Sequence, residues 1–209
     1  MRKLFISFEG GEGAGKSTQI RMLHGYLVER GNAVVVVRDP GGAKISEKIR
    51  EILKDKTNSA MSPRTEALLC FAARAQTMDE IIQPALEGGK IVISDRFSDS
   101  TFVYQGIAGG LSLGCLQGIN GFAVADIMPN ITFYLKINAK DGLARKIAQK
   151  ELDRIESRGS QYHTMVQEGY EELAKSDKGN KDGRIVTIDA TLPAAQIHTA
   201  IVSYVKKFL

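Results

Sequence analysis

The chain has 209 residues, of which 43% are hydrophobic and 25% are charged. These proportions are those of a soluble globular protein and exclude a disordered, collagen-like or disulfide-stapled chain. Its 28 Lys and Arg residues and 24 Asp and Glu residues leave a formal net charge of +4. That mild excess suits small anionic ligands and is too weak to indicate a nucleic-acid partner, so we expect none.

The sequence also indicates the compartment. Its two cysteines, Cys70 and Cys115, match no metal-binding or redox spacing, and lone thiols suit a reducing environment. The longest aliphatic run, 33–37, is far shorter than the roughly 20 residues of a membrane-spanning helix. The apolar N-terminal stretch stops at Glu9, and no signal-peptide cleavage site follows it. We therefore expect a cytoplasmic protein with no membrane partner.

Taken in chain order, short runs rich in Val, Ile and Phe predict five β-strands. They span 3–9, 33–38, 91–95, 131–135 and 184–189. Apolar residues at helical spacing predict helices after residue 16, around 68–75 and around 197–208. Short apolar strands that alternate with helices are typical of a parallel sheet covered on both faces. The sequence therefore predicts a three-layer α/β/α fold with a five-stranded parallel sheet, in a single domain over 1–209.

Two segments do not fit simple strand–helix units. The stretch 106–121 is rich in glycine, and the stretch from about 136 to 160 is polar and charged. In an α/β fold, additions of this kind usually form lids or interfaces, because loops carry function on a rigid scaffold. We expect a small mobile lid at about 140–160.

The residues that follow the first predicted strand, 10–17, read GGEGAGKS and fit the pattern GxxxxGK[ST]. Glycines let successive N–H groups turn inward around a phosphate, and the N-terminus of the next helix adds its positive end. Lys16 supplies a charge for the outer phosphates, and Ser17 supplies a hydroxyl for Mg²⁺. The pattern predicts a P-loop NTPase. Its expected ATP-binding residues are Gly10, Gly11, Glu12, Gly13, Ala14, Gly15, Lys16, Ser17 and Thr18.

Switches, motors and kinases share this loop, so it does not fix the reaction. A GTPase switch should also carry D-x-x-G and N-K-x-D. Residues 39–42, DPGG, match the first pattern, whereas 180–183, NKDG, fail the second because the fourth position is Gly. A partition-type ATPase is disfavoured because the loop lacks that class's extra lysine. A nucleotide-dependent switch or binding module stays as the alternative from another class.

More polar residues fall at the carboxyl ends of the next two strands, where ligands bind in open α/β sheets. Arg38 ends the second strand, and Asp95 and Arg96 end the third with a metal-facing carboxylate and a phosphate-facing guanidinium. Phe71 and Arg74 lie three residues apart on one helix face, as a stacking ring and a hydrogen-bonding group for a base. Hydroxyl and amide groups follow the third strand at Ser100, Thr101, Tyr104 and Gln105. Together these features favour phosphoryl transfer to a nucleotide.

Five motifs, FEGGEGAGKST, RDPGG, FAARAQ, DRFSDSTFVYQG and LDRIE, occur in this order along the chain. With their spacing they make nearly the whole chain similar to the bacterial thymidylate kinases, of the nucleoside monophosphate kinase group. The resemblance implies phosphorylation of dTMP to dTDP with ATP and Mg²⁺, by a homodimer. The alternative among enzymes is another nucleoside monophosphate kinase or a deoxynucleoside kinase. The latter needs a general base, for which Glu9 and Asp39 are the candidates.

The resemblance also implies a role for each site residue. Arg38 and Arg96 would grip the 5′-phosphate of dTMP, and Phe71 would stack on thymine. Tyr104 would pack against the deoxyribose. The expected metal site is Ser17 and Asp95. The expected dTMP-binding residues are Glu12, Arg38, Arg50, Phe71, Arg74, Arg96, Ser100, Thr101, Tyr104 and Gln105.

Two departures from the family pattern affect the expected chemistry. The usual REPGG is RDPGG here, which leaves the role of Asp39 open. In the lid, Ile147 and Gln149 stand where arginines are expected. We hypothesise that Arg145, together with Lys150 or Arg154, takes their place. The expected catalytic residues are then Lys16, Arg96, Arg145, Lys150 and Arg154.

The spacing of basic residues supports a substitute of this kind. If the lid is one helix, Lys146, Lys150, Arg154 and Arg158 stand at successive i,i+4 positions. Like charges so placed repel by a few tenths of a kcal/mol per pair, roughly, which an anionic ligand would relieve. The alternative is a solvated helix face whose basic residues are balanced by the four acidic residues of 136–158.

Overall fold

The structure is a computed structural model of the chain that describes residues 4–148, 152–178 and 183–209. Within these residues, parallel strands form one sheet in the order β2-β3-β1-β4-β5. The strands are β1 Leu4–Glu9, β2 Val34–Arg38, β3 Ile91–Asp95, β4 Ile131–Lys136 and β5 Ile185–Asp189. The predicted five-stranded parallel sheet is confirmed, and its strand ends differ from the predicted ones by at most one residue. The predicted strand residue 3 lies outside the described residues.

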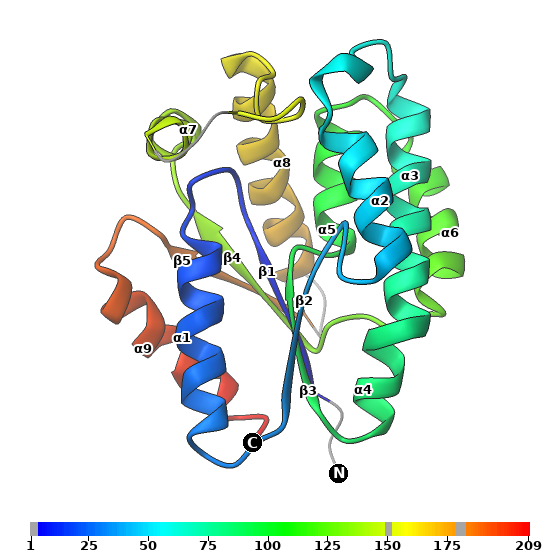
Figure 1. Cartoon of the computed structure of the whole chain (residues 1–209). Helices are drawn as coiled ribbons and strands as arrows, with labels where there is room; N and C mark the ends of the chain where they lie inside the picture. The colour runs from blue at the N-terminus through cyan, green and yellow to red at the C-terminus, as the bar shows by residue number, and fades with distance from the viewer. Residues whose placement is uncertain (1–3, 149–151, 179–182) are drawn as a thin grey trace.

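Helices cover both faces of the sheet (Figure 1). The α-helices are α1 Lys16–Val28, α2 Lys44–Lys54, α3 Pro63–Thr77, α4 Gln83–Glu87, α5 Ser98–Thr101, α6 Leu113–Val124, α7 Ala139–Ile147, α8 Ser160–Lys178 and α9 Ala194–Val205. A 3₁₀ turn, η1, spans Lys56–Asn58, and two π-helical segments, η2 Met78–Ile82 and η3 Phe102–Ile107, extend α3 and α5. None of the helices in the described residues has the length and apolarity needed to cross a bilayer.

Strand β1 shows how the sequence builds both faces of the sheet. All six of its residues are buried, as expected for a central strand between two helical layers. Because successive side chains of a strand alternate between faces, Leu4, Ile6 and Phe8 pack in the core formed with α1 and α9. Phe5 packs in the core on the other face, with η2 and α4. The continuous apolar run therefore places β1 in the middle of the sheet.

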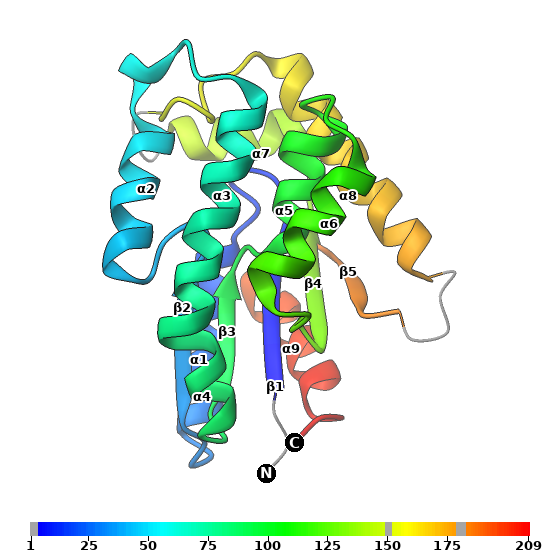
Figure 2. The same cartoon turned by 90° about the vertical axis from the view of Figure 1, so that its right-hand side faces the viewer.

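The register of the parallel strands brings the predicted site segments together. Asp95, at the end of β3, pairs with Phe8 of β1 on one side and with Arg38 of β2 on the other. The segments that follow β1, β2 and β3 therefore leave the sheet at the same carboxyl edge, where open α/β folds bind ligands. Figures 1 and 2 show α7 at this end of the molecule and the C-terminus at the opposite end.

The two irregular segments of the sequence contain helices. The glycine-rich stretch holds the C-terminal end of η3 and most of α6, and the polar stretch holds α7. Helix α7 ends at Ile147, and turns follow at 154–158. The idea that Lys146, Arg154 and Arg158 share one helix face is therefore wrong, because the helix stops before it reaches the two arginines. Lys150 lies outside the described residues.

Candidate active site

A cleft of about 400 Å³ opens at the carboxyl edge of the sheet. The phosphate loop forms one wall, the ends of β2 and β3 form the floor, and α3, α5 and η3 form the far wall. Most of the predicted site residues line it. They are Glu12, Gly13, Ala14, Gly15, Lys16, Ser17, Thr18, Arg38, Arg50, Arg74, Asp95, Arg96, Ser100, Thr101, Tyr104 and Gln105. The structure therefore brings most of the predicted site residues together in one cleft.

The phosphate loop turns from β1 into α1 through Gly15, whose φ of 85° lies in the left-handed region that favours glycine. Lys16 begins the helix, and its Nζ donates hydrogen bonds to the carbonyl oxygens of Gly10 and Gly11, each at 3.0 Å. Burial, followed by the nearby Arg96 charge, lowers the pKa of Lys16 to about 8. The loop thus holds an ammonium group that an anionic ligand would stabilise.

The backbone of the loop also contacts helix α7, which lies in the segment predicted to be a lid. A Cβ atom on Gly13 would overlap the carbonyl group of Gly142, and a Cβ atom on Gly142 would overlap the carbonyl oxygen of Glu12. Only glycine at both positions allows this approach. Helix α7 therefore packs directly on the main chain of the phosphate loop.

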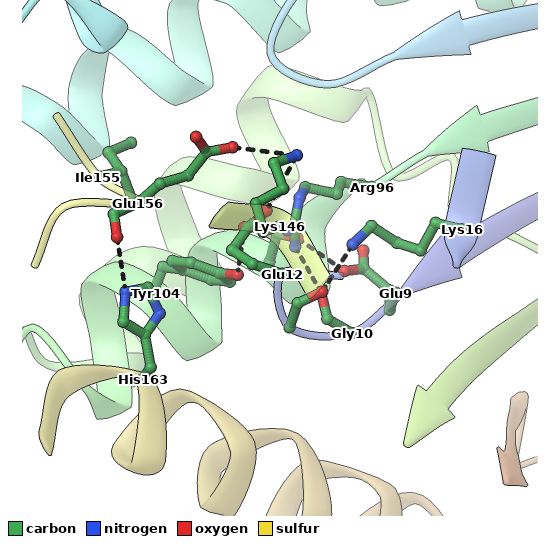
Figure 3. Close-up of polar contacts among 12 residues, drawn as sticks. Glu9, Gly10, Glu12, Lys16, Arg96, Tyr104, Lys146, Ile155, Glu156 and His163 are labelled. Carbon is green, nitrogen blue, oxygen red and sulfur yellow. Dashed lines mark hydrogen bonds and ion pairs between the residues drawn. The ribbon is translucent and has the colours of Figure 1, made fainter. Parts of the chain in front are cut away.

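Arg96 is the central cation of the cleft (Figure 3). Its φ of 71° is in the left-handed region, and its guanidinium donates hydrogen bonds to Glu12 Oε1 at 2.6 Å and Gly10 O at 2.9 Å. The ring of Tyr104 lies 5.0 Å below it, a cation–π contact. Burial alone would raise the pKa of Glu12, but Arg96 and then Lys16 outweigh it and lower the pKa to about 2.

Behind Arg96 lies a buried carboxylate, Glu9, in a network that the sequence did not reveal. Its Oε1 accepts a hydrogen bond from Phe97 N at 2.7 Å. Its Oε2 accepts hydrogen bonds from Ser100 Oγ at 2.6 Å and Tyr170 Oη at 2.7 Å. Burial, and then the Asp99 charge, raise the pKa of Glu9 to about 7. Tyr170 comes from α8, 161 residues along the chain, so no local pattern could have predicted it.

The raised pKa of Glu9 makes stability depend on pH. Between the ordinary value of 4.5 and about 7, the folded protein holds a proton that the unfolded chain has lost. The free energy of unfolding is therefore expected to fall as pH rises through this window, by up to about 1.4 kcal/mol per pH unit. Urea unfolding of wild type and Glu9→Gln at several pH values tests this. The difference in unfolding free energy between wild type and Glu9→Gln should change with pH at up to that slope. The control variant Glu172→Gln, at an exposed position, should show the same pH dependence as wild type.

Asp39, whose role the sequence left open, holds Arg74. Both side chains are buried, and Arg74 Nε donates a hydrogen bond to Asp39 Oδ2 at 2.7 Å. The same guanidinium donates to Asn120 Oδ1 at 3.2 Å and to Thr101 Oγ1 at 2.8 Å. Asp39 is thus engaged with a charged partner, which does not favour it as a general base.

Three expected dTMP ligands have other neighbours in the structure. Phe71 is buried between α3 and α6 and is not among the residues that line the cleft. Arg38 lines the cleft but forms a two-pronged contact with Glu47, with Nη2 2.6 Å from Oε2. Arg50 donates a hydrogen bond to Pro40 O at 2.7 Å at the cleft wall. The cleft therefore contains both guanidinium groups, whereas Phe71 lies behind its wall.

The expected metal ligands lie together at the mouth of the loop. Ser17 Oγ donates a hydrogen bond to Asp95 Oδ2 at 3.4 Å. A hydroxyl and a carboxylate suit Mg²⁺, which usually binds one or two carboxylates and takes its other ligands from waters and substrate phosphates. Among the described residues there is no cluster of three or more His, Cys, Asp or Glu side chains that could hold a metal ion.

Helix α7, in the segment predicted to be a lid, brings a different cation to the cleft from those expected. Lys146 of α7 lines the cleft, with Nζ 3.2 Å from Glu156 Oε1 and 3.8 Å from Glu12 Oε2 (Figure 3). Arg145, its neighbour on the helix, instead donates to Ala190 O at 3.4 Å. Arg154 is buried against Leu53 O and Glu66. The structure brings neither arginine to the cleft.

The fold is a parallel sheet, and at its carboxyl edge a glycine-rich loop surrounds a buried lysine. This arrangement defines a P-loop NTPase. In this chain, a second polar wall of the cleft lies beside the loop. The thymidylate kinase family model matches residues 8–201. A thymidylate kinase from Thermoanaerobacter sp. (strain X514) is 43% identical over 209 residues, covering 100% of both chains. One from Symbiobacterium thermophilum is 45% identical over 206 residues, covering 99% of this chain and 94% of its own.

A solved structure agrees with these relatives. The crystal structure of thymidylate kinase from Ehrlichia chaffeensis matches with a TM-score of 0.79 and 28% sequence identity, covering 99% of this chain and 100% of the other. The chain belongs to the thymidylate kinase family.

Proposed function

We propose that the protein transfers the γ-phosphoryl group of ATP to dTMP, giving dTDP and ADP. The observation that carries this proposal is a cleft with two walls. One wall is the phosphate loop with Lys16, and the other wall contains the donor and acceptor side chains of Arg74, Thr101 and Gln105. Arg96 lies between them and contacts the loop carbonyl of Gly10. A donor and an acceptor nucleotide bound to these walls would direct their phosphates toward Arg96.

The residues act mainly by positioning and by charge. The dTMP phosphate is already an anion, so its oxygen attacks the γ-phosphorus without a general base, and in-line geometry supplies much of the acceleration. Lys16 and Arg96 neutralise charge on the phosphates as it is redistributed. Tyr104, which donates a hydrogen bond to Glu12 Oε1 at 3.1 Å, lies where the sugar of the acceptor would pack.

We further propose that Ser17 and Asp95 hold Mg²⁺ together with the phosphates of ATP. Their oxygen atoms and their position beside Lys16 fit a hard cation. When bound, the ion neutralises phosphate charge and orients the phosphate oxygens. The expected cytoplasmic location and the single domain with a lid at about 140–160 also belong to this proposal.

In the lid, we propose Lys146 as the cation that faces the phosphates, in place of Arg145 or Arg154. Lys146→Met is expected to lower kcat about 30-fold, less than loss of a fully engaged arginine, because a lysine makes fewer simultaneous contacts. Lys140→Met, an exposed position on the same helix, is the matched control and should keep kcat within about 2-fold. If Lys146→Met has a normal kcat and Arg145→Met has a greatly lowered kcat, the proposal is wrong and Arg145 is the cation that faces the phosphates.

The homodimer implied by the family is also proposed, with support from exposed apolar side chains on two adjacent helices. Phe122 of α6 is 90% exposed and Leu68 of α3 is 54% exposed, which is costly unless a partner covers them. Phe122→Glu is therefore expected to convert a dimer into a monomer in light scattering. Leu192→Glu, which changes an exposed leucine outside this patch, should leave the mass unchanged. A monomeric wild type would contradict the proposal.

The first experiment is a coupled assay of ADP release with ATP and Mg²⁺. The acceptors are dTMP, dUMP, dCMP, GMP, AMP and thymidine. Strong stimulation by dTMP, lost when Mg²⁺ is omitted, is the expected result. Stimulation by a different monophosphate or by thymidine alone would exclude the proposed acceptor, and steady hydrolysis without any acceptor would indicate a switch.

A further inference from the structure

Glu66 is a buried carboxylate whose two oxygen atoms bind different parts of the chain. It lies in the first turn of α3 and its side chain is 2% exposed. Oε2 accepts hydrogen bonds from Arg154 Nη2 at 2.6 Å and Arg158 Nη2 at 2.7 Å. Oε1 accepts a hydrogen bond from Gln105 Nε2 at 2.9 Å. Glu66 thus joins the segment that follows the lid to a side chain in the cleft wall.

This contact determines which end of the Gln105 amide is turned toward the cleft. A carboxylate accepts hydrogen bonds and has none to donate, so only the amide nitrogen of Gln105 bonds to Glu66. The amide oxygen points in a different direction, and among the described residues it accepts no hydrogen bond. Gln105 lines the cleft. A ligand in the cleft would therefore meet the amide oxygen, a hydrogen-bond acceptor, at this position.

Arg74 presents the opposite polarity to the same cleft. All the nitrogens of a guanidinium group are donors, and Asp39, Asn120 and Thr101 hold this one in place. A fixed donor and a fixed acceptor lining the same cleft would match the 4-carbonyl and the N3–H of thymine or uracil. Cytosine presents an amino group and an unprotonated N3, the reverse order, and would leave buried groups unpaired.

We propose that Glu66 is a positioning residue that determines base selectivity. By holding the nitrogen of the Gln105 amide, it keeps the oxygen toward the cleft and so favours a pyrimidine with N3–H over cytosine. This inference rests on the proposed function, because it concerns which monophosphate the enzyme accepts. Arg154, the more buried of the two arginines on Glu66, keeps the carboxylate in place, which gives this LDRIE arginine a role outside the phosphate chemistry.

The test compares kcat/KM for dTMP with kcat/KM for dCMP. In Glu66→Gln, the new amide can donate to the Gln105 oxygen and turn that amide around. The selectivity ratio is expected to fall about 10-fold or more, chiefly through a higher KM for dTMP. Arg158→Met, which removes one guanidinium from Glu66 but keeps the Gln105 contact, should preserve the ratio. If Glu66→Gln does not fold, Glu66→Asp withdraws the carboxylate from Gln105 while keeping its charge, and the same fall is expected.

A double-variant cycle separates positioning from a merely structural role. In a Gln105→Met background, changing Glu66 should leave the selectivity ratio unchanged, because the group through which it acts is gone. An equal fall with and without Gln105, or an unchanged ratio in a folded Glu66 variant, would overturn the inference. The wild type reports on the proposed function separately: equal turnover of dTMP and dCMP overturns only the inference, and turnover of neither overturns both.

Discussion

Lys16→Ala is expected to lower kcat for phosphoryl transfer by about 10³-fold or more. The side chain is nearly buried within the phosphate loop, where Nζ contacts the carbonyl oxygens of Gly10 and Gly11 at 3.0 Å. An alanine cannot supply the charge that the β- and γ-phosphates need there. The measurement is single-turnover transfer from ATP to dTMP, which reports the chemical step directly.

The same substitution is expected to leave the fold intact. Burial, and then Arg96, lower the pKa of Lys16 to about 8. The charged ammonium group is therefore destabilised in the folded protein, and its replacement by alanine removes this unfavourable contribution. Circular dichroism and thermal unfolding should therefore show a transition at least as high as that of wild type. Lys175→Ala, at an exposed position on α8, controls for the loss of a lysine. A wild-type transfer rate in Lys16→Ala would contradict the role assigned to the loop.

Arg96→Met is expected to have the second largest effect, a loss of about 10³-fold in kcat. The guanidinium lies between the phosphate loop and the opposite cleft wall, where we propose that dTMP binds. Its contacts with Gly10 O, Ser100 and Glu12 fix its orientation. Lysine has no planar fork, so Arg96→Lys should not restore activity. Steady-state kinetics with dTMP and ATP varied separately would show whether the loss is in kcat, in the KM for dTMP or in the KM for ATP.

Unlike Lys16→Ala, Arg96→Met should also destabilise the protein. Removing the cation leaves Glu12 without its closest charged partner, at a cost of about 3 kcal/mol. The pKa of Glu12, about 2 in the wild type, should rise toward its ordinary value, so the loss of stability should be larger at neutral than at acidic pH. Arg64→Met, at an exposed position in the first turn of α3, should change neither kcat nor stability. Full activity and stability in Arg96→Met would contradict the site geometry.

The fold and the outline of the cleft were predictable because both depend on local patterns. Strand-sized apolar runs placed β1, β2 and β3, and the rule that parallel strands end at one edge placed Arg38, Asp95 and Arg96 together. The phosphate loop was predictable because its glycines and its lysine are consecutive. These predictions needed no knowledge of distant contacts.

The partners of the buried charges were not predictable from spacing. Glu9 meets Tyr170 of α8, and Glu66 meets Gln105 and Arg154, across 39 to 161 residues of chain. Lys146, the cation that we propose for the lid, was not predicted for a different reason. Periodicity extended a helix past Ile147, where the helix ends, and so grouped Lys146 with arginines that face elsewhere.

The contact of Gly13 with Gly142 connects the phosphate loop directly to helix α7. Main chain meets main chain there, so neither the loop nor α7 can shift far toward the other without the other yielding. Linkage is reciprocal. If nucleotide binding stabilises one arrangement of α7, then that arrangement of α7 raises the affinity for the nucleotide by the same free energy. Lys146 lies one helical turn beyond Gly142, so if α7 moves as the proposed lid, nucleotide binding at the phosphate loop and the position of the Lys146 charge would be coupled.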